Sequence, residues 1–401
     1  MPPLLANGSA SHEYQNMTTE DQNPRVPSPR ENPYFEGHEG AESELLAATS
    51  GGRVHHAWLI TGPKGIGKAT LAYRFARHLL ANPQAEAQGP ALFAPEEAPS
   101  CSLALDPESP TFRRISAGGH ADLLSVERGF MDEGKGGRGA NSKDNKRRRR
   151  SEIVIGDVRK VGEFLSLTAI EGGWRVVIVD GAEDMNPSAA NALLKTLEEP
   201  PNRAILLLLS HAPGRLLPTI RSRCRRLTLE RLEEARVESL IARYRPDLGP
   251  DEARALARIG DGSIGQALTL ADAGGLALYE ELVHLLSELP RPGVTRMHGA
   301  LDAIARTRDA TGAYQAYEVF TDLLTGWLMR LVTARARGIE PLEIMPGENE
   351  IAARLIARAD LDQWVEVWEK ITRLFGRASR LNLDRKQVLL EAFFALGRTA
   401  T

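Results

Sequence analysis

A glycine-rich loop that ends in a lysine carries the strongest chemical signal in the sequence. The loop Gly62-Pro63-Lys64-Gly65-Ile66-Gly67-Lys68 lies between an apolar, strand-like run at 57–60 and a helical pattern. Its glycines let successive backbone N–H groups point at one anion, and the helix N-terminus adds partial positive charge. The lysine can reach the terminal phosphates of a nucleotide. The spacing therefore predicts a phosphate-binding site at Gly62, Gly65, Gly67 and Lys68.

The residues that follow this loop are poorly suited to hydrolysis. The position after the loop lysine normally supplies a hydroxyl that holds Mg²⁺, and here it is Ala69, whose methyl group cannot do so. Thr70 is the next hydroxyl in the sequence. We expect it to face elsewhere, because consecutive residues of a helix point about 100° apart. Both residues are still part of the predicted nucleotide site.

Asp180 ends a second apolar run and matches the aspartate that holds the metal in P-loop nucleotide sites. A glutamate beside that aspartate usually polarises the attacking water, but Gly181 occupies the position here. Glu183 could replace it only if the loop had an unusual geometry. The alternative for Asp180 is a purely structural role, as the N-cap of the helix that follows.

Strand and helix patterns alternate through the first half of the chain, which predicts an α/β domain with a parallel sheet. Apolar runs at 57–60, 176–179 and 205–209 are typical of buried strands, and 189–199 is typical of a helix that ends at two prolines. Beyond residue 231 the strand patterns stop and helical patterns continue. We expect an α/β domain at 33–230, a small helical domain at 231–275 and a larger helical domain at 276–401.

Two segments are too polar or too charged to form a core. Residues 1–32 lack apolar periodicity, and we expect a disordered tail there. Residues 128–150 are basic and end in a run of one lysine and four arginines, so we expect a solvated loop inserted in the α/β domain. This insert is either a tolerated extension of a loop tip or an arm that contacts phosphate groups or a partner.

Composition excludes several classes of protein. The 401 residues contain 50 Lys and Arg against 53 Asp and Glu, a net charge of −3, so the whole chain is not a polycation that coats nucleic acid. The two cysteines, Cys101 and Cys224, cannot build a disulfide framework or a four-cysteine zinc site. The apolar runs are far shorter than the roughly 20 residues of a membrane helix. We expect a soluble, cytoplasmic protein that does not bind membranes.

Several further segments resemble the clamp-loader branch of the AAA+ ATPases. The resemblance rests on 191–201 (NALLKTLEEPP), on Ser222-Arg223-Cys224, and on 119–124 (GHADLL) and 170–175 (IEGGWR). It extends over about 35–268, and within that branch it is most similar to the delta-prime family of bacterial DNA polymerase III subunits. The resemblance implies an AAA+ P-loop domain with a parallel sheet, then a small helical lid domain and a C-terminal helical collar domain that assembles the subunits.

The resemblance also implies roles for single positions. Arg223 is similar to the arginine finger that reaches the γ-phosphate of ATP held by a neighbouring subunit. Without the resemblance, an arginine between polar neighbours would be read as a solvated or salt-bridged side chain. Ser210 and His211 fall at the first nucleotide sensor of the family, and Gly265 stands where the second sensor carries an arginine. The zinc-binding cysteines of the family are absent, so we expect no zinc.

Three positions distinguish a motor from a subunit that does not hydrolyse ATP. Ala69, Gly181 and Gly265 each lack a group that hydrolysis or its sensing uses, although the phosphate loop is kept. We therefore expect ATP or ADP to bind weakly without turnover, in a clamp-loader subunit that supplies Arg223 in trans. The alternative is a catalytically active AAA+ ATPase subunit of a clamp loader. A regulatory ATP-binding protein outside replication would not need the segment 222–224.

The implied partners follow from the same resemblance. They are the tau or gamma ATPase subunits and the delta subunit in a hetero-pentamer, with the sliding clamp and primer-template DNA reached through the complex. The chain would help to load the clamp onto primed DNA. It would thus belong to a DNA-directed DNA polymerase holoenzyme, with its own ATPase site inactive.

Overall fold

The computed structural model describes most of the chain, namely residues 26–50, 54–82, 102–129, 150–171, 173–306, 315–381 and 383–401. Most of the expected tail and of the basic insert lies outside these described residues. The two ends of the insert are described, and the N–H of Arg150 donates to the carbonyl oxygen of Gly129 at 2.7 Å. The chain therefore leaves and re-enters the fold at one point.

Five parallel strands form one sheet in the order β2-β3-β4-β1-β5. The strands are β1 (Ala57–Thr61), β2 (Leu123–Val126), β3 (Arg175–Asp180), β4 (Ala204–Ser210) and β5 (Arg225–Thr228). The three apolar runs expected to be strands correspond to β1, β3 and β4. These strands are buried almost throughout, because helices cover both faces of the sheet. The predicted α/β class with a parallel sheet is confirmed.

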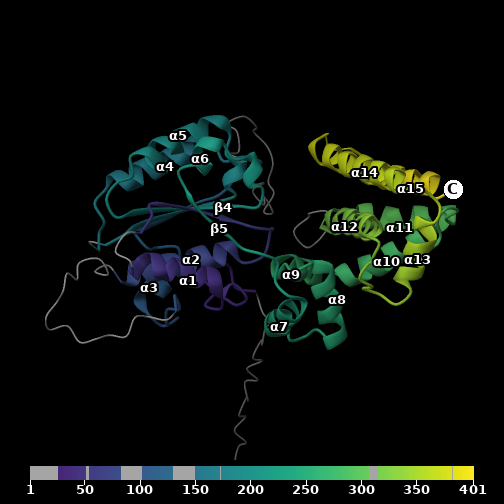
Figure 1. Cartoon of the computed structure of the whole chain (residues 1–401), viewed down its shortest axis with the longest axis horizontal. Helices are drawn as coiled ribbons and strands as arrows, with labels where there is room; N and C mark the ends of the chain where they lie inside the picture. The colour runs from purple at the N-terminus through teal and green to yellow at the C-terminus, as the bar shows by residue number, and fades with distance from the viewer. Residues whose placement is uncertain are drawn as a thin grey trace, which may run out of the picture.

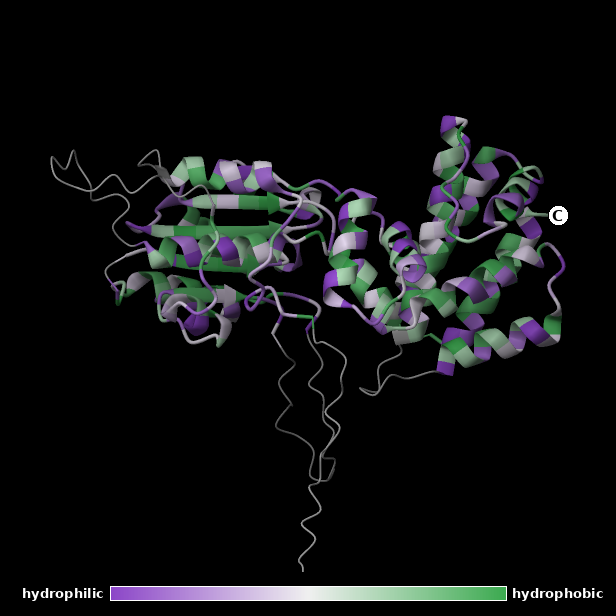
Figure 2. Ribbon diagram, turned by 90° about the horizontal axis from the view of Figure 1, so that it is seen from below, coloured by the Kyte–Doolittle hydropathy of each residue, from purple (hydrophilic) through white to green (hydrophobic). Residues whose placement is uncertain are grey.

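Two layers of helices cover the sheet (Figure 1). One face carries α1 (Glu39–Ser50), α2 (Lys68–Ala81) and α3 (Pro110–Ser116). The other face carries α4 (Ile155–Ser166), α5 (Pro187–Glu198) and α6 (Pro218–Arg221), with short 3₁₀ turns at Ala182–Asp184 and Pro213–Arg215. Figure 2 shows the strands as a hydrophobic band between helices of mixed character. Each face of the sheet therefore has its own apolar core.

In the described part of the chain beyond residue 231, every regular element is a helix, as the sequence predicts. The first three are α7 (Glu234–Tyr244), α8 (Pro250–Gly260) and α9 (Ile264–Asp272). The rest are α10 (Gly275–Ser287), α11 (Val294–Arg306), α12 (Gln315–Arg337), α13 (Glu348–Ile356), α14 (Leu361–Leu381) and α15 (Arg385–Thr399). One apolar cluster runs from Leu232 to Ala400 and joins the two groups of helices.

The segment 26–32 differs from the expected disordered tail, because it is packed against the folded chain. Arg77 is only 1% exposed. Its guanidinium donates to the carbonyl oxygens of Arg30 at 3.3 Å and of Asn32 at 2.9 Å. The Asn32 amide in turn donates to the Tyr244 hydroxyl at 2.8 Å. These contacts are polar and involve backbone carbonyls, so the apolar pattern of the segment could not indicate them.

Replacing Arg77 by Met should release the segment 26–32. Methionine keeps much of the side-chain volume but has no donor for the two carbonyl oxygens, and an unpaired buried polar group costs about 1–3 kcal/mol. We expect the amides of Glu31 and Asn32, which donate to the Ser28 carbonyl, to exchange at least about tenfold faster. Hydrogen exchange measured by mass spectrometry on a peptide that covers 28–32 tests this.

The matched control is Arg113→Met on α3, which removes an arginine whose side chain is 64% exposed. This variant should leave the exchange of 28–32 unchanged. Equal exchange in the native chain and in Arg77→Met would show that Arg77 does not hold the segment.

Candidate functional site

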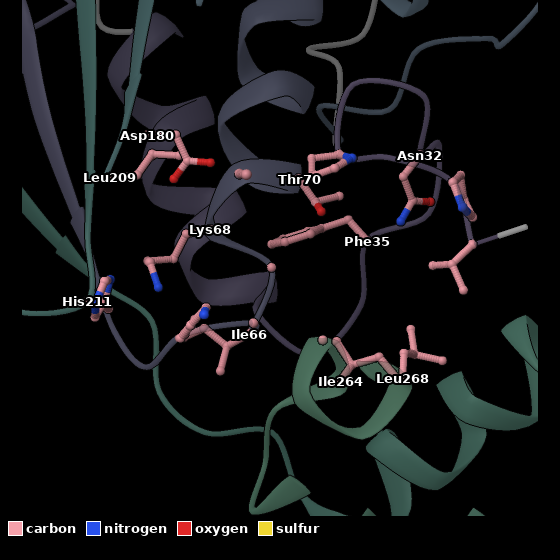
Figure 3. A pocket seen from close by; sticks show the side chains of 18 of the residues that line it. Asn32, Phe35, Ile66, Lys68, Thr70, Asp180, Leu209, His211, Ile264 and Leu268 are labelled. Atoms are coloured by element: carbon pink, nitrogen blue, oxygen red, sulfur yellow. The ribbon is translucent and has the colours of Figure 1, made fainter. Parts of the chain in front are cut away.

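A cavity of about 380 Å³ opens beside the phosphate loop, between the α/β domain and the lid helices, which are α7, α8 and α9. Its walls come from the loop at 64–68, Asp180 at the end of β3, the segment 32–36 and the start of α9 (Figure 3). This is the carboxyl edge of a parallel sheet, where α/β folds bind their ligands. Of the residues predicted for the nucleotide site, those that line this cavity are Gly65, Gly67, Lys68, Ala69, Thr70 and Asp180, and Gly62 does not line it.

The phosphate loop holds its own lysine. The Lys68 ammonium donates to the carbonyl oxygens of Gly62 at 2.8 Å and of Pro63 at 2.5 Å. Gly65 and Gly67 have φ angles of +79° and +104°, a region that favours glycine, and Gly67 is the N-cap of α2. Partial burial lowers the pKa of Lys68, although nearby carboxylates act to raise it. A phosphate that approaches Lys68 must therefore compete with two carbonyl oxygens of the loop.

Ala69 and Thr70 lie as expected. Ala69 packs against the apolar core on the α2 face of the sheet. Thr70 lies on the side of the cavity with Phe35 and Asn32, away from Asp180 (Figure 3). The hydroxyl that follows the loop is thus directed away from the carboxylate that would share a metal ion with it.

Asp180 opens into the cavity from the end of β3. Its pKa is raised because the surrounding protein removes water from the carboxyl group and Glu127 adds negative charge, while Lys68 has the opposite effect. The following 3₁₀ turn begins after Gly181, and α5 is capped by the Asn186 side chain. The alternative interpretation of Asp180 as a helix N-cap is therefore wrong.

Glu183 is engaged by the end of β4. Its buried carboxylate accepts the backbone N–H of His211 at 2.9 Å and also contacts Nδ1 of the His211 ring. Burial acts to raise the pKa of Glu183, but hydrogen bonds from backbone N–H groups and from Ser210 hold the pKa below its usual value. One carboxylate oxygen of Glu183 is thus tied to the predicted first sensor, whereas the other is buried without a hydrogen-bond partner among the described residues. Glu183 does not line the cavity, so it is not placed to activate water there.

The N-terminus of α9 is in direct contact with the phosphate loop. The Ser263 hydroxyl donates to the Lys64 carbonyl at 2.8 Å, and the N–H of Gly265 donates to the Gly65 carbonyl at 2.8 Å. A Cβ atom at position 265 would lie 2.8 Å from Cα and 3.0 Å from the carbonyl oxygen of Gly65. Only glycine therefore fits at position 265 without displacing the backbone of Gly65. The sequence indicates a missing arginine at this position but not this steric constraint.

Arg223 lies between α6 and the start of β5, beside the last residue of α5, so it is at the amino edge of the parallel sheet, whereas the phosphate loop follows β1 at the carboxyl edge. Helix α6 covers the same face of the sheet as α4 and α5 (Figure 1). Its guanidinium donates to the Thr219 carbonyl at 3.0 Å and forms an ion pair with Glu198 at 2.8 Å. The neighbours of Arg223 are anchored, because Ile220 is fully buried and the partly buried Cys224 packs against the same apolar core. Arg223 itself remains partly exposed.

Comparison with known proteins identifies the family. A sequence profile described as "DNA polymerase III, delta subunit" matches residues 37–233. The delta' subunit of DNA polymerase III from Pseudomonas aeruginosa PAO1 is 31% identical over 298 residues, which cover 74% of this chain and 79% of that relative. The chain belongs to the delta-prime family of DNA polymerase III subunits. It is therefore an AAA+ clamp-loader subunit, as the sequence predicts.

Two further relatives are also subunits of DNA polymerase III. The delta' subunit of Escherichia coli K12 is 32% identical over 244 residues, which cover 61% of this chain and 63% of that relative. The gamma/tau subunit of DNA polymerase III from Mycobacterium tuberculosis H37Rv is 29% identical over 356 residues, which cover 82% of this chain and 55% of that relative. This delta-prime family member thus resembles gamma/tau subunits as well as other delta' subunits.

Some residues of the cavity were missed from the sequence. Asn32, Phe35 and Tyr244 line it, although Asn32 was assigned to the tail. The aromatic pair Tyr34-Phe35, directly after the polar segment, was the available signal.

Cys101 lies outside the described residues, so the absence of zinc stays a prediction. None of the helices in the described ranges combines the length and apolar character that crossing a membrane requires.

Gly265→Arg should destabilise this delta-prime chain rather than restore a sensor. The new Cβ meets the backbone of Gly65, and inserting atoms into packed contacts typically costs about 1–3 kcal/mol. We expect the free energy of unfolding, measured by urea denaturation of the isolated chain, to fall by about that amount. Gly299→Arg on α11 is the control, because a Cβ there meets no atom within 4 Å. Equal stability of the two variants would contradict the role of Gly265.

Proposed function

We propose that this clamp-loader subunit does not hydrolyse ATP and that it supplies Arg223 in trans to the nucleotide site of a neighbouring ATPase subunit. The observation that carries the proposal is the separation of two functions on one sheet. The phosphate loop lies at the carboxyl edge of the sheet, whereas Arg223 lies partly exposed at the amino edge, beside the end of α5, and does not line the chain's own cavity. An arginine in that place is available to another subunit but not to its own nucleotide.

The chemistry of Arg223 suits this role. A planar guanidinium keeps its charge at all accessible pH values and presents five N–H donors in a fork that fits phosphate oxygens. During transfer of the γ-phosphoryl group, negative charge spreads over its equatorial oxygens, and a donor placed there in advance stabilises the transition state. Such arginines increase kcat by roughly 10³–10⁵ where they act.

The chain's own site supports weak binding of ATP or ADP without turnover. The loop amides and Lys68 would hold the phosphates, and Phe35, Ile264 and Leu268 line the part of the cavity away from Lys68 (Figure 3). Binding has to displace Lys68 from the two loop carbonyls, which lowers affinity. The missing hydroxyl at Ala69 and carboxylate at Gly181 leave neither full metal ligation nor water activation.

We propose the partners from the same family relationship. They are tau or gamma ATPase subunits and a delta subunit in a hetero-pentamer, with the sliding clamp and primer-template DNA engaged through the complex. The alternative is a catalytically active AAA+ subunit, for which the similarity to gamma/tau is the supporting observation. That alternative requires hydrolysis at a site with alanine at 69 and glycine at 181.

The purified chain should show no ATPase activity above background. Metal ligation and water activation both fail, so Ala69→Thr alone should not restore turnover, because the carboxylate would still be missing at Gly181. Phosphate release at saturating Mg·ATP measures this, with a gamma/tau subunit as the positive control. Steady turnover on the order of 1 s⁻¹, the low end for ordinary enzymes, would establish the catalytic alternative instead.

Arg223→Ala should leave the complex assembled and slow its clamp- and DNA-stimulated ATP hydrolysis. The arginine acts on one of several interfaces, so the steady-state loss should be smaller than the roughly 10³-fold expected at a single isolated site. Arg223→Lys should recover only part of the rate, because an ammonium lacks the planar fork. Size-exclusion chromatography confirms assembly, and phosphate release gives the rate.

Arg221→Ala is the matched control, since it removes an exposed arginine two residues away on α6. It should keep the stimulated rate. A fully assembled Arg223→Ala complex with an unchanged rate would remove the trans-acting role, and an equal loss in Arg221→Ala would show a general effect of charge.

A further inference from the structure

The guanidinium of Arg223 is fixed by two different elements of its own chain. One terminal nitrogen donates to the Thr219 carbonyl at 3.0 Å, and the other forms the ion pair with the Glu198 carboxylate at 2.8 Å. Thr219 lies on α6, four residues before Arg223, whereas Glu198 is the last residue of α5. The direction in which Arg223 points is therefore set by the packing of α5 against α6.

The position of Glu198 is not explained by the helix that carries it. The C-terminus of a helix has partial negative charge, so a carboxylate in the last turn is unfavourable and a cation such as Lys195 is favourable. Glu199, the next residue, is also exposed but has no contact with Arg223 among the ion pairs of the described residues. The contact with Arg223 is thus the interaction that gives Glu198 a role.

The strength of this ion pair suits an orienting contact. The side chains of Arg223 and Glu198 are 36% and 50% exposed, and exposed pairs of this kind contribute about 0–1 kcal/mol. This is too little to sequester the arginine from a phosphate, yet it restricts a side chain that otherwise has about 2 kcal/mol of rotamer entropy. The two contacts use two of the five guanidinium N–H groups, so three remain for an outside acceptor.

We propose that Glu198 is a positioning residue that holds Arg223 in the orientation in which it meets the nucleotide of the neighbouring subunit. The inference rests on the proposed trans-acting role of Arg223 and adds the residue that prepares it. Glu198 acts only through Arg223. By restricting the orientations of the guanidinium beforehand, it reduces the entropy that Arg223 loses when it binds the transition state, and so it lowers the barrier of the partner's reaction. It contacts neither ATP nor the reacting atoms.

The test uses reconstituted clamp-loader complexes that carry Glu198→Ala, Glu198→Gln or the matched control Glu199→Gln. Clamp- and DNA-stimulated ATP hydrolysis is measured over a range of ATP concentrations, so that kcat and KM are obtained separately. We expect Glu198→Ala to lower kcat two- to fivefold without a change in KM, the range that corresponds to an exposed ion pair. Glu198→Gln should lose less, because its amide oxygen still accepts from Arg223, and Glu199→Gln should match the native complex.

A double variant separates positioning from a general structural effect. In the Arg223→Ala background, Glu198→Ala should cause no further loss, because the side chain that it orients is gone. A further loss in that background, a higher kcat in Glu198→Ala, or a change confined to KM would overturn the inference. An unchanged rate in Glu198→Ala together with a slow Arg223→Ala complex would overturn the positioning role alone. An unchanged rate in Arg223→Ala would overturn the proposed function and this inference with it.

Discussion

The hydrogen bond from the Gly265 N–H to the Gly65 carbonyl fixes how closely α9 approaches the phosphate loop. It brings the N-terminus of α9 onto the phosphate loop so closely that position 265 has no room for a side chain. The glycine at the position where the resemblance implies a sensor arginine is thus explained by the close contact between α9 and the phosphate loop. The lid helices share their apolar cluster with the helices that follow, so the loop is connected to the C-terminal half of the chain through packed side chains.

The length of the parallel strands separates the phosphate loop from Arg223. Parallel strands place the loop and Asp180 at the carboxyl edge, where helix α2 begins, while the connection between β4 and β5 carries Arg223 at the amino edge. The phosphate loop and Arg223 therefore cannot contact the same nucleotide within one chain.

The sequence predicted those parts of the structure that depend on periodicity or on fixed spacing. Apolar runs located β1, β3 and β4 because these strands are buried on both faces, and the loop at 62–68 was recognisable from its glycines and lysine. The packing of 26–32 could not be predicted, because Arg77 binds backbone carbonyls that have no residue-specific signal. The same holds for the contact of Gly265 with Gly65 and for the pairing of Arg223 with Glu198, which depend on how distant elements approach one another.

The two ends of the basic insert lie next to each other, with the N–H of Arg150 bonded to the carbonyl of Gly129. When the ends of a loop are already joined, the entropy of closing it grows only with the logarithm of its length, by about 0.6 kcal/mol for each doubling. The fold therefore hardly restricts how many residues stand between these two positions. A fluorescent label or a small folded tag could replace part of the insert and report on the clamp loader from a point that β2 and α4 hold in place.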